Sequence, residues 1–371
     1  MSVENPYLWV MDRLLRINEF AQTTIGQLCR KIEAFAEAWE DRADLSPDQL
    51  SRLRELATVQ SIGSSTRIEG VRLTDAEIEE FLQNMTVQKL QSRDQQEVVG
   101  YFDTLQIILE NFEHIELTTN LIRGLHKQLL QHSTKDERHR GNYKALTNEV
   151  VATLPDGSQR GVFQTTSPMR TPDAMEAAVR WYGAHIGGGQ FHELVVIGAF
   201  VYEFLTIHPF QDGNGRLSRL LTTLLLLKNG YEFIQYTSLE QEIEAYKADY
   251  YKSLLRAQRY RETERETIES WLIFFLRAVE RATKRLAQDR GYLAAESPAL
   301  YLNRRQRSVL RYFDRHDTLS VGDIHRLLPE ESRNTLKVDL AKMTKAGLLV
   351  RRGRGRGTVY QSVARTDFTA I

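Results

Sequence analysis

Apolar side chains recur at every third or fourth position through most of the first 300 residues, a spacing typical of amphipathic helices. Thr74 and Glu77 have the spacing of a capping box, which marks the start of one such helix. The chain is therefore predicted to be mainly α-helical in this part. The predicted helices cover 18–38, 47–60, 74–82, 95–112, 118–131, 171–186, 193–207, 217–228, 245–258 and 266–286.

Residues 148–165 break this helical pattern. Two short β-prone runs flank Pro155-Asp156-Gly157, which is a strong turn signal, so the segment is predicted to be a β-hairpin. A hairpin that projects from a helical body is a candidate flap over a site, and a plain surface excursion is the alternative.

The pattern changes again near the C-terminus. Helices are predicted over 304–313, 320–328 and 331–346, followed by a hairpin whose basic loop spans 351–357. Three helices and a hairpin resemble a winged helix-turn-helix. In that likeness the third helix presents Arg333, Asn334 and Lys337 to DNA, and the wing arginines meet phosphate. Glu330 and Glu331 oppose DNA binding, and winged domains also dock proteins or dimerise.

The amino-acid composition excludes several classes of protein. The chain has 371 residues, 42% of them hydrophobic and 26% charged, as expected for a soluble protein with sizeable cores. Cys29 is the only cysteine, which excludes a disulfide scaffold. No apolar run approaches the roughly 18 residues of a membrane helix, and the N-terminus lacks the features of a signal peptide. We therefore expect a cytoplasmic protein without a membrane partner.

The net charge of the whole chain is zero, but positive and negative residues are distributed unevenly along it. Residues 303–371 contain 15 Lys+Arg and 7 Asp+Glu, a net of +8, so the preceding residues carry −8. The change falls near residues 296–298, where a domain boundary is predicted. Three domains are expected: an N-terminal helical region over 1–110, a catalytic core over 111–297 and a basic domain over 298–371.

The most informative stretch joins two predicted helices at residues 207–219. The first helix should end at His208, because the residue before a proline disfavours helical geometry. A Gly-Asn-Gly turn then enters the next helix, where backbone N–H groups form an anion pocket. Arg216 and Arg219 are predicted in the first turn of that helix, where the helix dipole disfavours cations, so an anion is expected between them.

Two further side chains complete a phosphate-transfer site. Asp212 offers a carboxylate where Mg²⁺ would bridge protein and nucleotide, and His208 has a pKa suited to a general base. A calcium loop is excluded because Arg216 and Leu217 replace the oxygen ligand and glycine that it needs. A Walker loop is excluded because no Gly-Lys-Ser/Thr follows. The set indicates phosphoryl or nucleotidyl transfer.

Residues 208–219 resemble the Fic motif, His-Pro-Phe-x-Asp/Glu-Gly-Asn-Gly-Arg-x-x-Arg, at every fixed position. The resemblance covers roughly residues 60–260 and implies a helical enzyme that moves AMP from ATP to a protein hydroxyl. It makes His208 the base and Asp212 the Mg²⁺ ligand. A phosphorylating sister group carries lysine at the position of Gly215, so glycine there favours AMP transfer. The resemblance counts these residues as nucleotide-binding: Asp212, Gly213, Asn214, Gly215, Arg216, Leu217, Ser218 and Arg219, with Arg219 on the γ-phosphate.

A second segment resembles the inhibitory motif of Fic proteins, Ser/Thr-x-x-x-Glu-Gly/Asn. Ser65 and Glu69 lie four residues apart on one predicted helical face, and Gly70 is a natural C-terminal cap. The likeness implies that Glu69 pairs with Arg219 and competes with the γ-phosphate. A solvated surface glutamate is the alternative.

The same family suggests the rest of the nucleotide pocket. A hairpin that follows a Gly-x-Tyr/Phe-Arg-like segment docks the target in relatives, and here Lys144 stands in place of arginine. Val150 and Val151 are the flap residues expected to face the ligand. Tyr250 and Tyr251 match a pair that contacts adenosine, with simple packing as the alternative.

The sequence therefore predicts an ATP- and Mg²⁺-dependent protein adenylyltransferase that is inhibited by Glu69. Its partner would be a protein with a Ser, Thr or Tyr hydroxyl, and the chain itself is one candidate. The alternatives are a DNA-binding regulator whose Fic domain senses nucleotide, and a bidirectional enzyme that also removes AMP. A homodimer is an open expectation.

Overall fold

The structure is a computed structural model that describes residues 17–40, 45–84, 90, 92–153, 159–295, 304–313, 316–345, 348–353 and 355–363. Side chains are described for most of these, but not for residues 40, 149–164, 291–295, 304, 307 and 356. The chain is mainly helical with few strands, as the sequence predicts. It forms two compact units, one of residues 1–42 and 53–286, the other of residues 43–52 and 287–371. The boundary predicted at residue 110 falls inside the first unit, within a helix.

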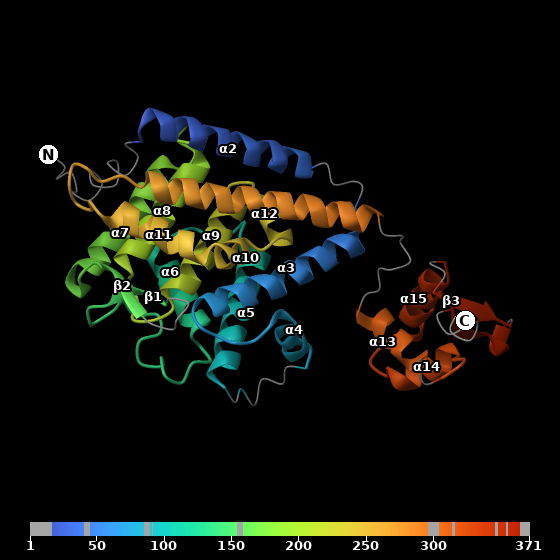
Figure 1. The fold of residues 1–371 in the computed structure, drawn as a ribbon. Helices are drawn as coiled ribbons and strands as arrows, with labels where there is room; N and C mark the ends of the chain where they lie inside the picture. The colour runs from blue at the N-terminus through green and yellow to red at the C-terminus, as the bar shows by residue number, and fades with distance from the viewer. Residues whose placement is uncertain are drawn as a thin grey trace. The chain divides into compact units, whose positions relative to one another are not determined.

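The first unit is an assembly of helices with one small hairpin (Figure 1). Its elements are α2 (Glu19–Glu40), α3 (Pro47–Ile68), α4 (Asp75–Gln83), α5 (Arg93–Asn111), α6 (Thr119–Leu129), β1 (Glu149–Thr153), β2 (Gln159–Gln164), α7 (Thr171–His185), α8 (Glu193–Ile207), α9 (Asn214–Lys228), α10 (Leu239–Ala245), α11 (Lys247–Gln258) and α12 (Glu269–Ala295).

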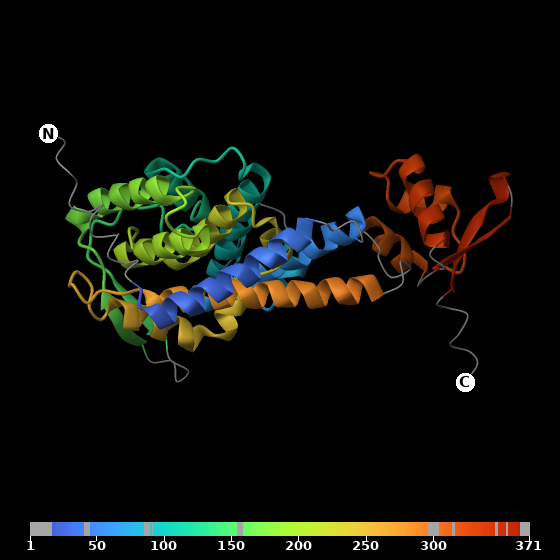
Figure 2. The same cartoon turned by 90° about the horizontal axis from the view of Figure 1, so that it is seen from above.

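Helix α8 is the centre of this unit. Every residue from Leu194 to Ile207 is buried, because the helix is apolar on all sides and is covered all round. It packs against α7 and α9, and α9 packs in turn against α5 and α6. Helix α2 lies alongside α12 in both views (Figures 1 and 2), where the backbone and amide nitrogens of Asn18 donate to Glu269. The loop between α8 and α9 is thus held by buried helices on both sides.

The predicted hairpin is present. Strands β1 and β2 pair antiparallel, and the register shifts between Val150 and Val151, as in a β-bulge. Strand β2 contacts α11. The expected turn at 155–157 lies outside the described residues, as do the side chains of the two valines.

Three expectations about helices need correction. Helix α3 runs without a break from the stretch predicted over 47–60 into the helical segment predicted around Ser65 and Glu69, and it ends at Ile68. Helix α9 begins at Asn214, so Arg219 lies in the second turn and not the first. Helix α10 was not predicted, since its seven residues are too few for a visible period.

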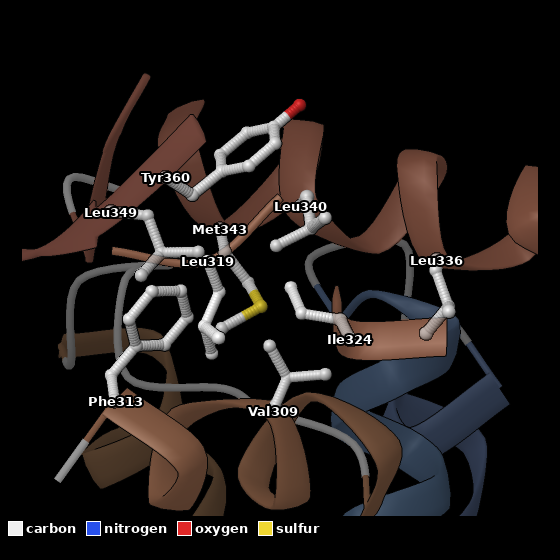
Figure 3. Close-up of a cluster of buried hydrophobic side chains, with 9 residues drawn as sticks. All are labelled: Val309, Phe313, Leu319, Ile324, Leu336, Leu340, Met343, Leu349 and Tyr360. Carbon is white, nitrogen blue, oxygen red and sulfur yellow. The ribbon is translucent and has the colours of Figure 1, made fainter. Parts of the chain in front are cut away.

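The second unit contains α13 (Arg304–Phe313), α14 (Val321–Leu327), α15 (Arg333–Lys345), β3 (Leu349–Arg352) and β4 (Val359–Ser362). Strands β3 and β4 pair antiparallel, and Leu319 adds an isolated bridge to Tyr360. Nine side chains from all these elements converge on one core (Figure 3). They are Val309, Phe313, Leu319, Ile324, Leu336, Leu340, Met343, Leu349 and Tyr360.

No helix in the described part of the chain is long and apolar enough to cross a membrane.

Candidate functional site

His208 ends α8 in the left-handed conformation, with φ 51° and ψ 60°. Its Nδ1 lies 3.2 Å from the carbonyl oxygen of Leu205, so this nitrogen carries the proton and donates. Burial lowers the pKa of His208 to about 4, which keeps the ring neutral at pH 7. The lone pair of the ring is therefore on Nε2, as a general base requires.

Asn214 fixes the turn that follows. Its side-chain oxygen accepts from the backbone nitrogen of Phe210 at 2.9 Å, and its amide nitrogen donates to the carbonyl oxygen of Phe210 at 2.7 Å. Gly213 adopts φ 80°, a left-handed conformation that favours glycine. The first N–H groups of α9, from Asn214 onward, have no acceptor within the helix and are therefore able to bind an anion.

Only one carboxylate oxygen of Asp212 accepts hydrogen bonds from the described residues. Its Oδ1 accepts from the backbone nitrogen of Gly213 at 2.6 Å and from Nη2 of Arg216 at 3.0 Å. The other terminal nitrogen of Arg216 lies 2.9 Å from Oε2 of Glu97 on α5, and the Arg216 side chain is only 2% exposed. Burial alone would raise the pKa of Asp212, but the charge of Arg216 and the Gly213 N–H lower it, so the carboxylate is ionised.

The second oxygen of Asp212 faces two exposed cations. Its Oδ2 lies 3.6 Å from Nζ of Lys135 and 3.8 Å from Nη2 of Arg93. Within the described residues no cluster of three His, Cys, Asp or Glu side chains is suited to hold a metal. One carboxylate with a free oxygen fits Mg²⁺ all the same, since this ion is commonly held by one or two carboxylates and the phosphates of the substrate.

Glu69 reaches the site from the end of α3. Its Oε1 lies 2.8 Å from Nη2 of Arg219. Ser65 holds the same guanidinium twice, through its hydroxyl at 2.7 Å from Nε and through its carbonyl oxygen at 2.9 Å from Nη2. A Cβ on Gly215 would stand 2.2 Å from Oε1 of Glu69, so this carboxylate lies directly against the first turn of α9. The sequence-predicted Ser65, Glu69 and Arg219 thus meet.

The Glu69–Arg219 pair is charged. Burial would raise the pKa of Glu69, but the neighbouring Arg219 and Arg216 lower it overall. The pKa of Arg219 is raised, because the Glu69 carboxylate outweighs the opposing effect of burial. An anion entering the pocket must therefore displace a full negative charge from Arg219. Gly70 ends the segment with φ 108°, as a C-terminal cap does.

His126 on α6 was not singled out from the sequence. Its Nδ1 accepts from the backbone nitrogen of Gly141 at 2.9 Å, so its Nε2 carries the proton and donates to the carbonyl oxygen of Asp212 at 3.0 Å. The ring stacks on Phe210 with centroids 3.7 Å apart. Burial lowers the pKa of His126 to about 4. This neutral histidine connects the loop to the chain before the flap.

Lys144 lies just before the hairpin and has a buried side chain. Its ammonium donates to the side chains of Asn148 and Thr165, at 2.8 Å each, and to the carbonyl oxygen of Ile207 at 2.9 Å. Asn148 in turn donates to the carbonyl oxygen of Phe210 at 2.8 Å. The two ends of the hairpin are thereby attached to the end of α8. Burial lowers the pKa of Lys144 to about 8.

Tyr250 and Tyr251 pack against each other. Tyr250 is 4% exposed and stands edge-to-face against Tyr251, with centroids 5.1 Å apart. Leu217 and Ser218, also expected near the nucleotide, have buried side chains, and the Ser218 hydroxyl donates to the carbonyl oxygen of Gly215.

Comparisons with known proteins agree with this geometry. A model of the Fic/DOC family matches residues 116–226. Protein adenylyltransferase Fic of Drosophila erecta is 28% identical over 218 residues, which are 58% of this chain and 40% of that protein. The protein of the same name from Drosophila melanogaster is 28% identical over 184 residues, 49% of this chain and 35% of that protein. The chain thus covers less than half the length of these relatives.

Solved structures share the fold. A Fic family protein from Desulfovibrio desulfuricans G20 aligns with TM-score 0.63 and 22% identity, over 94% of this chain and 97% of that one. Fic-1 (residues 134–508) from C. elegans aligns with TM-score 0.56 and 20% identity, over 74% of each chain.

Proposed function

We propose that this chain is a protein adenylyltransferase that moves AMP from ATP to a Ser, Thr or Tyr hydroxyl of a protein. The match of residues 116–226 to the Fic/DOC family model supports this proposal. The names of the Drosophila relatives support this reaction. The neutral His208 with its Nε2 lone pair supports it further, because a domain that only senses nucleotide has no use for a base.

The chemistry follows from the loop. The oxygen of the target hydroxyl attacks the α-phosphorus of ATP. At the same time Nε2 of His208 accepts the proton of that hydroxyl. The bond from that phosphorus to the bridging oxygen breaks, and pyrophosphate leaves. The N–H groups at the start of α9 bind phosphate oxygens and stabilise the charge that develops on them.

Asp212 would hold Mg²⁺ through Oδ2, while Arg216 and Gly213 fix the carboxylate through Oδ1. The ion supplies charge neutralisation of the phosphates when bound. The tyrosines, Val150 and Val151 remain proposed contacts of the adenosine and of the target.

We further propose that this protein is self-inhibited, and the contact of Glu69 with Arg219 is the observation that carries the proposal. The Glu69 carboxylate is paired with the guanidinium of Arg219, to which the γ-phosphate would otherwise bind. ATP then binds either weakly or in a geometry that does not react. Release of Glu69 would turn the enzyme on.

One experiment tests both proposals. Wild type, Glu69→Gly and His208→Ala are incubated with labelled ATP and Mg²⁺, and the label is located by mass spectrometry on the chain and on added proteins. We expect the mass of AMP on a hydroxyl, more of it with Glu69→Gly, and none with His208→Ala. Addition of a phosphate mass refutes AMP transfer, and an equal rate for wild type and Glu69→Gly refutes inhibition. Loss of AMP from purified modified protein would reveal the reverse reaction.

A second function, duplex DNA binding, is favoured by the charge of the C-terminal unit. Arg333, Asn334 and Lys337 are exposed on α15, and Arg351 and Arg352 are exposed on β3. Glu331, an acid that opposes DNA binding, is paired with Arg305 at 3.2 Å.

Titration of the full chain with a labelled duplex tests this second function. We expect affinity that falls steeply with added salt and that is weakened by Lys337→Gln. Absence of binding at low salt would show that this unit serves another purpose, such as docking a protein.

A further inference from the structure

Arg216 is enclosed by two carboxylates. Its guanidinium is 2% exposed and lies 2.9 Å from Glu97 and 3.0 Å from Asp212. Moving it onto a phosphate would leave Glu97, with 8% side-chain exposure, as a buried carboxylate with one fewer cation. Its Nη2 donates to Asp212, whereas Nε and Nη1 have no hydrogen-bond partner in the described part of the chain. Arg216 therefore orients Asp212 and keeps two donors that an anion could use.

Arg93 and Lys135 are the opposite case. Their side chains are 60% and 63% exposed, and their head groups lie 3.8 and 3.6 Å from the free oxygen of Asp212. These separations are longer than a hydrogen-bonded ion pair, which is about 2.7–2.9 Å. Nε of Arg93 donates to Oε1 of Glu97 at 2.7 Å, so only its terminal nitrogens are left for another anion. Neither Arg93 nor Lys135 makes a hydrogen bond to Asp212.

Cations and carboxylates alternate around Asp212. Three cations, Arg93, Lys135 and Arg216, lie near the carboxylates of Asp212 and Glu97. Asp136, which accepts from Ser133, adds a third negative charge that acts on Arg93. The case for an anion therefore rests on the exposed positions of Arg93 and Lys135 and not on an excess of charge. Arg93 is also the first residue of α5, where the helix dipole disfavours a positive charge.

We propose that Arg93 and Lys135 form a cationic rim that binds the β- and γ-phosphates of ATP, the part that leaves as pyrophosphate. This inference rests on the proposed function and extends its site to two residues outside the Fic motif. Before the nucleotide arrives, the charge of Asp212 attracts both cations without a hydrogen bond to either. When the polyphosphate binds, the cations turn to it and leave that oxygen open to Mg²⁺.

The test measures binding rather than transfer. The full chain carrying Glu69→Gly, in which Arg219 is open to an anion, is titrated calorimetrically without Mg²⁺ with inorganic pyrophosphate and, separately, with AMP. We expect Arg93→Gln and Lys135→Gln each to weaken pyrophosphate binding about 3- to 10-fold, as for loss of one charge-assisted contact at an exposed site. AMP, which lacks the outer phosphates, should bind within about twofold of the parent.

Three controls sharpen the result. Arg138→Gln removes the same charge from an exposed position on the segment that carries Lys135, and it should leave both probes unchanged. Lys135→Arg keeps the charge and should restore pyrophosphate binding. Lys135→Gln is independent of Glu97, so its effect does not come from a disturbed α5.

Pyrophosphate affinity that is unaffected in both variants, or an equal loss for AMP, would overturn the rim. Failure of the parent to bind pyrophosphate would overturn it as well. If the rim variants behave as expected but no AMP is ever transferred, the proposed function fails and the rim stands. If transfer occurs and pyrophosphate binding is unchanged, the function stands and the rim fails.

Discussion

Arg67 near the end of α3 forms a bidentate ion pair with Glu244 on α10. Nε of Arg67 lies 2.8 Å from Oε1 of Glu244, and Nη2 lies 3.0 Å from Oε2. The third nitrogen of Arg67 donates to Asp75 on α4 at 2.8 Å. Lys247 at the start of α11 donates to the carbonyl oxygen of Ile68 at 2.8 Å. These bonds fix the turn that delivers Glu69 to Arg219, so Glu69 is positioned by residues outside the inhibitory motif.

Replacing Arg67 should therefore weaken the inhibition. Arg67→Met removes the fork on Glu244 and frees the end of α3, and we expect AMP transfer by the otherwise wild-type chain to rise about 3- to 10-fold, equivalent to roughly 1 kcal/mol. The measurement is the initial rate with labelled ATP.

The same substitution in a chain that lacks Glu69 shows whether the rise in AMP transfer depends on that carboxylate. In a Glu69→Gly chain, Arg67→Met should change the rate little, because there is no carboxylate left to position. Arg72→Met, at an exposed position beyond the motif, serves as the charge-matched control. A similar rise in both backgrounds would show that Arg67 acts by another route.

Gly215 and Glu69 should be energetically coupled. A Cβ at residue 215 would stand 2.2 Å from Oε1 of Glu69 and 3.3 Å from a nitrogen of Arg219. Gly215→Ala should thus lower the free energy of unfolding of the wild type by about 1 kcal/mol or more, as the ion pair is forced apart. With Glu69→Gly the same change should be neutral or stabilising by up to about 1 kcal/mol, since alanine favours helix. Denaturant unfolding of the four chains gives the coupling, and additive effects would contradict it.

The activity should be insensitive to pH near neutrality. His208 must be neutral to accept a proton, and burial lowers its pKa to about 4, so the base form is populated at all pH values above that. We expect transfer by Glu69→Gly to be flat from about pH 8 to about pH 5 and to fall as pH approaches 4. An unshifted histidine would lose activity near pH 6.5. Single-turnover rates across this range, with circular dichroism to check folding, distinguish the two midpoints.

Stability should depend on pH through His126. The folded pKa is about 4, below the unfolded value of about 6.5, so unfolding takes up a proton between these limits. There is no penalty above pH 6.5, and the free energy of unfolding falls as the pH is lowered, by up to about 1.4 kcal/mol per pH unit for this histidine. His126→Gln should reduce that slope. Denaturant unfolding at pH 4.5 to 7.5 measures it, and an unchanged slope would show that His126 does not titrate in this way.

Much of the local structure follows from the sequence. The capping box of Thr74 and Glu77, the proline after His208 and the glycine at residue 70 mark real helix ends. The phosphate-binding loop could be recognised because all its parts lie within 12 consecutive positions, where residue type and spacing decide the backbone. The unbroken length of α3 from Pro47 to Ile68 was not predicted, because the residues that join its two predicted parts have no amphipathic period.

What surrounds the loop was decided by tertiary packing. Glu69 and Arg219 are 150 residues apart, and the partners of Arg216, His126 and Arg67 come from other helices or from distant loops. Local periodicity carries no information on which helices meet or in what orientation, since that depends on how their buried faces fit together, as those of α5 and α6 do against α9. The sequence by itself determined which reactive side chains the loop carries. Only the packing decided that Arg216 is enclosed, that Glu69 lies against Gly215, and that Arg93 and Lys135 lie within 4 Å of Asp212.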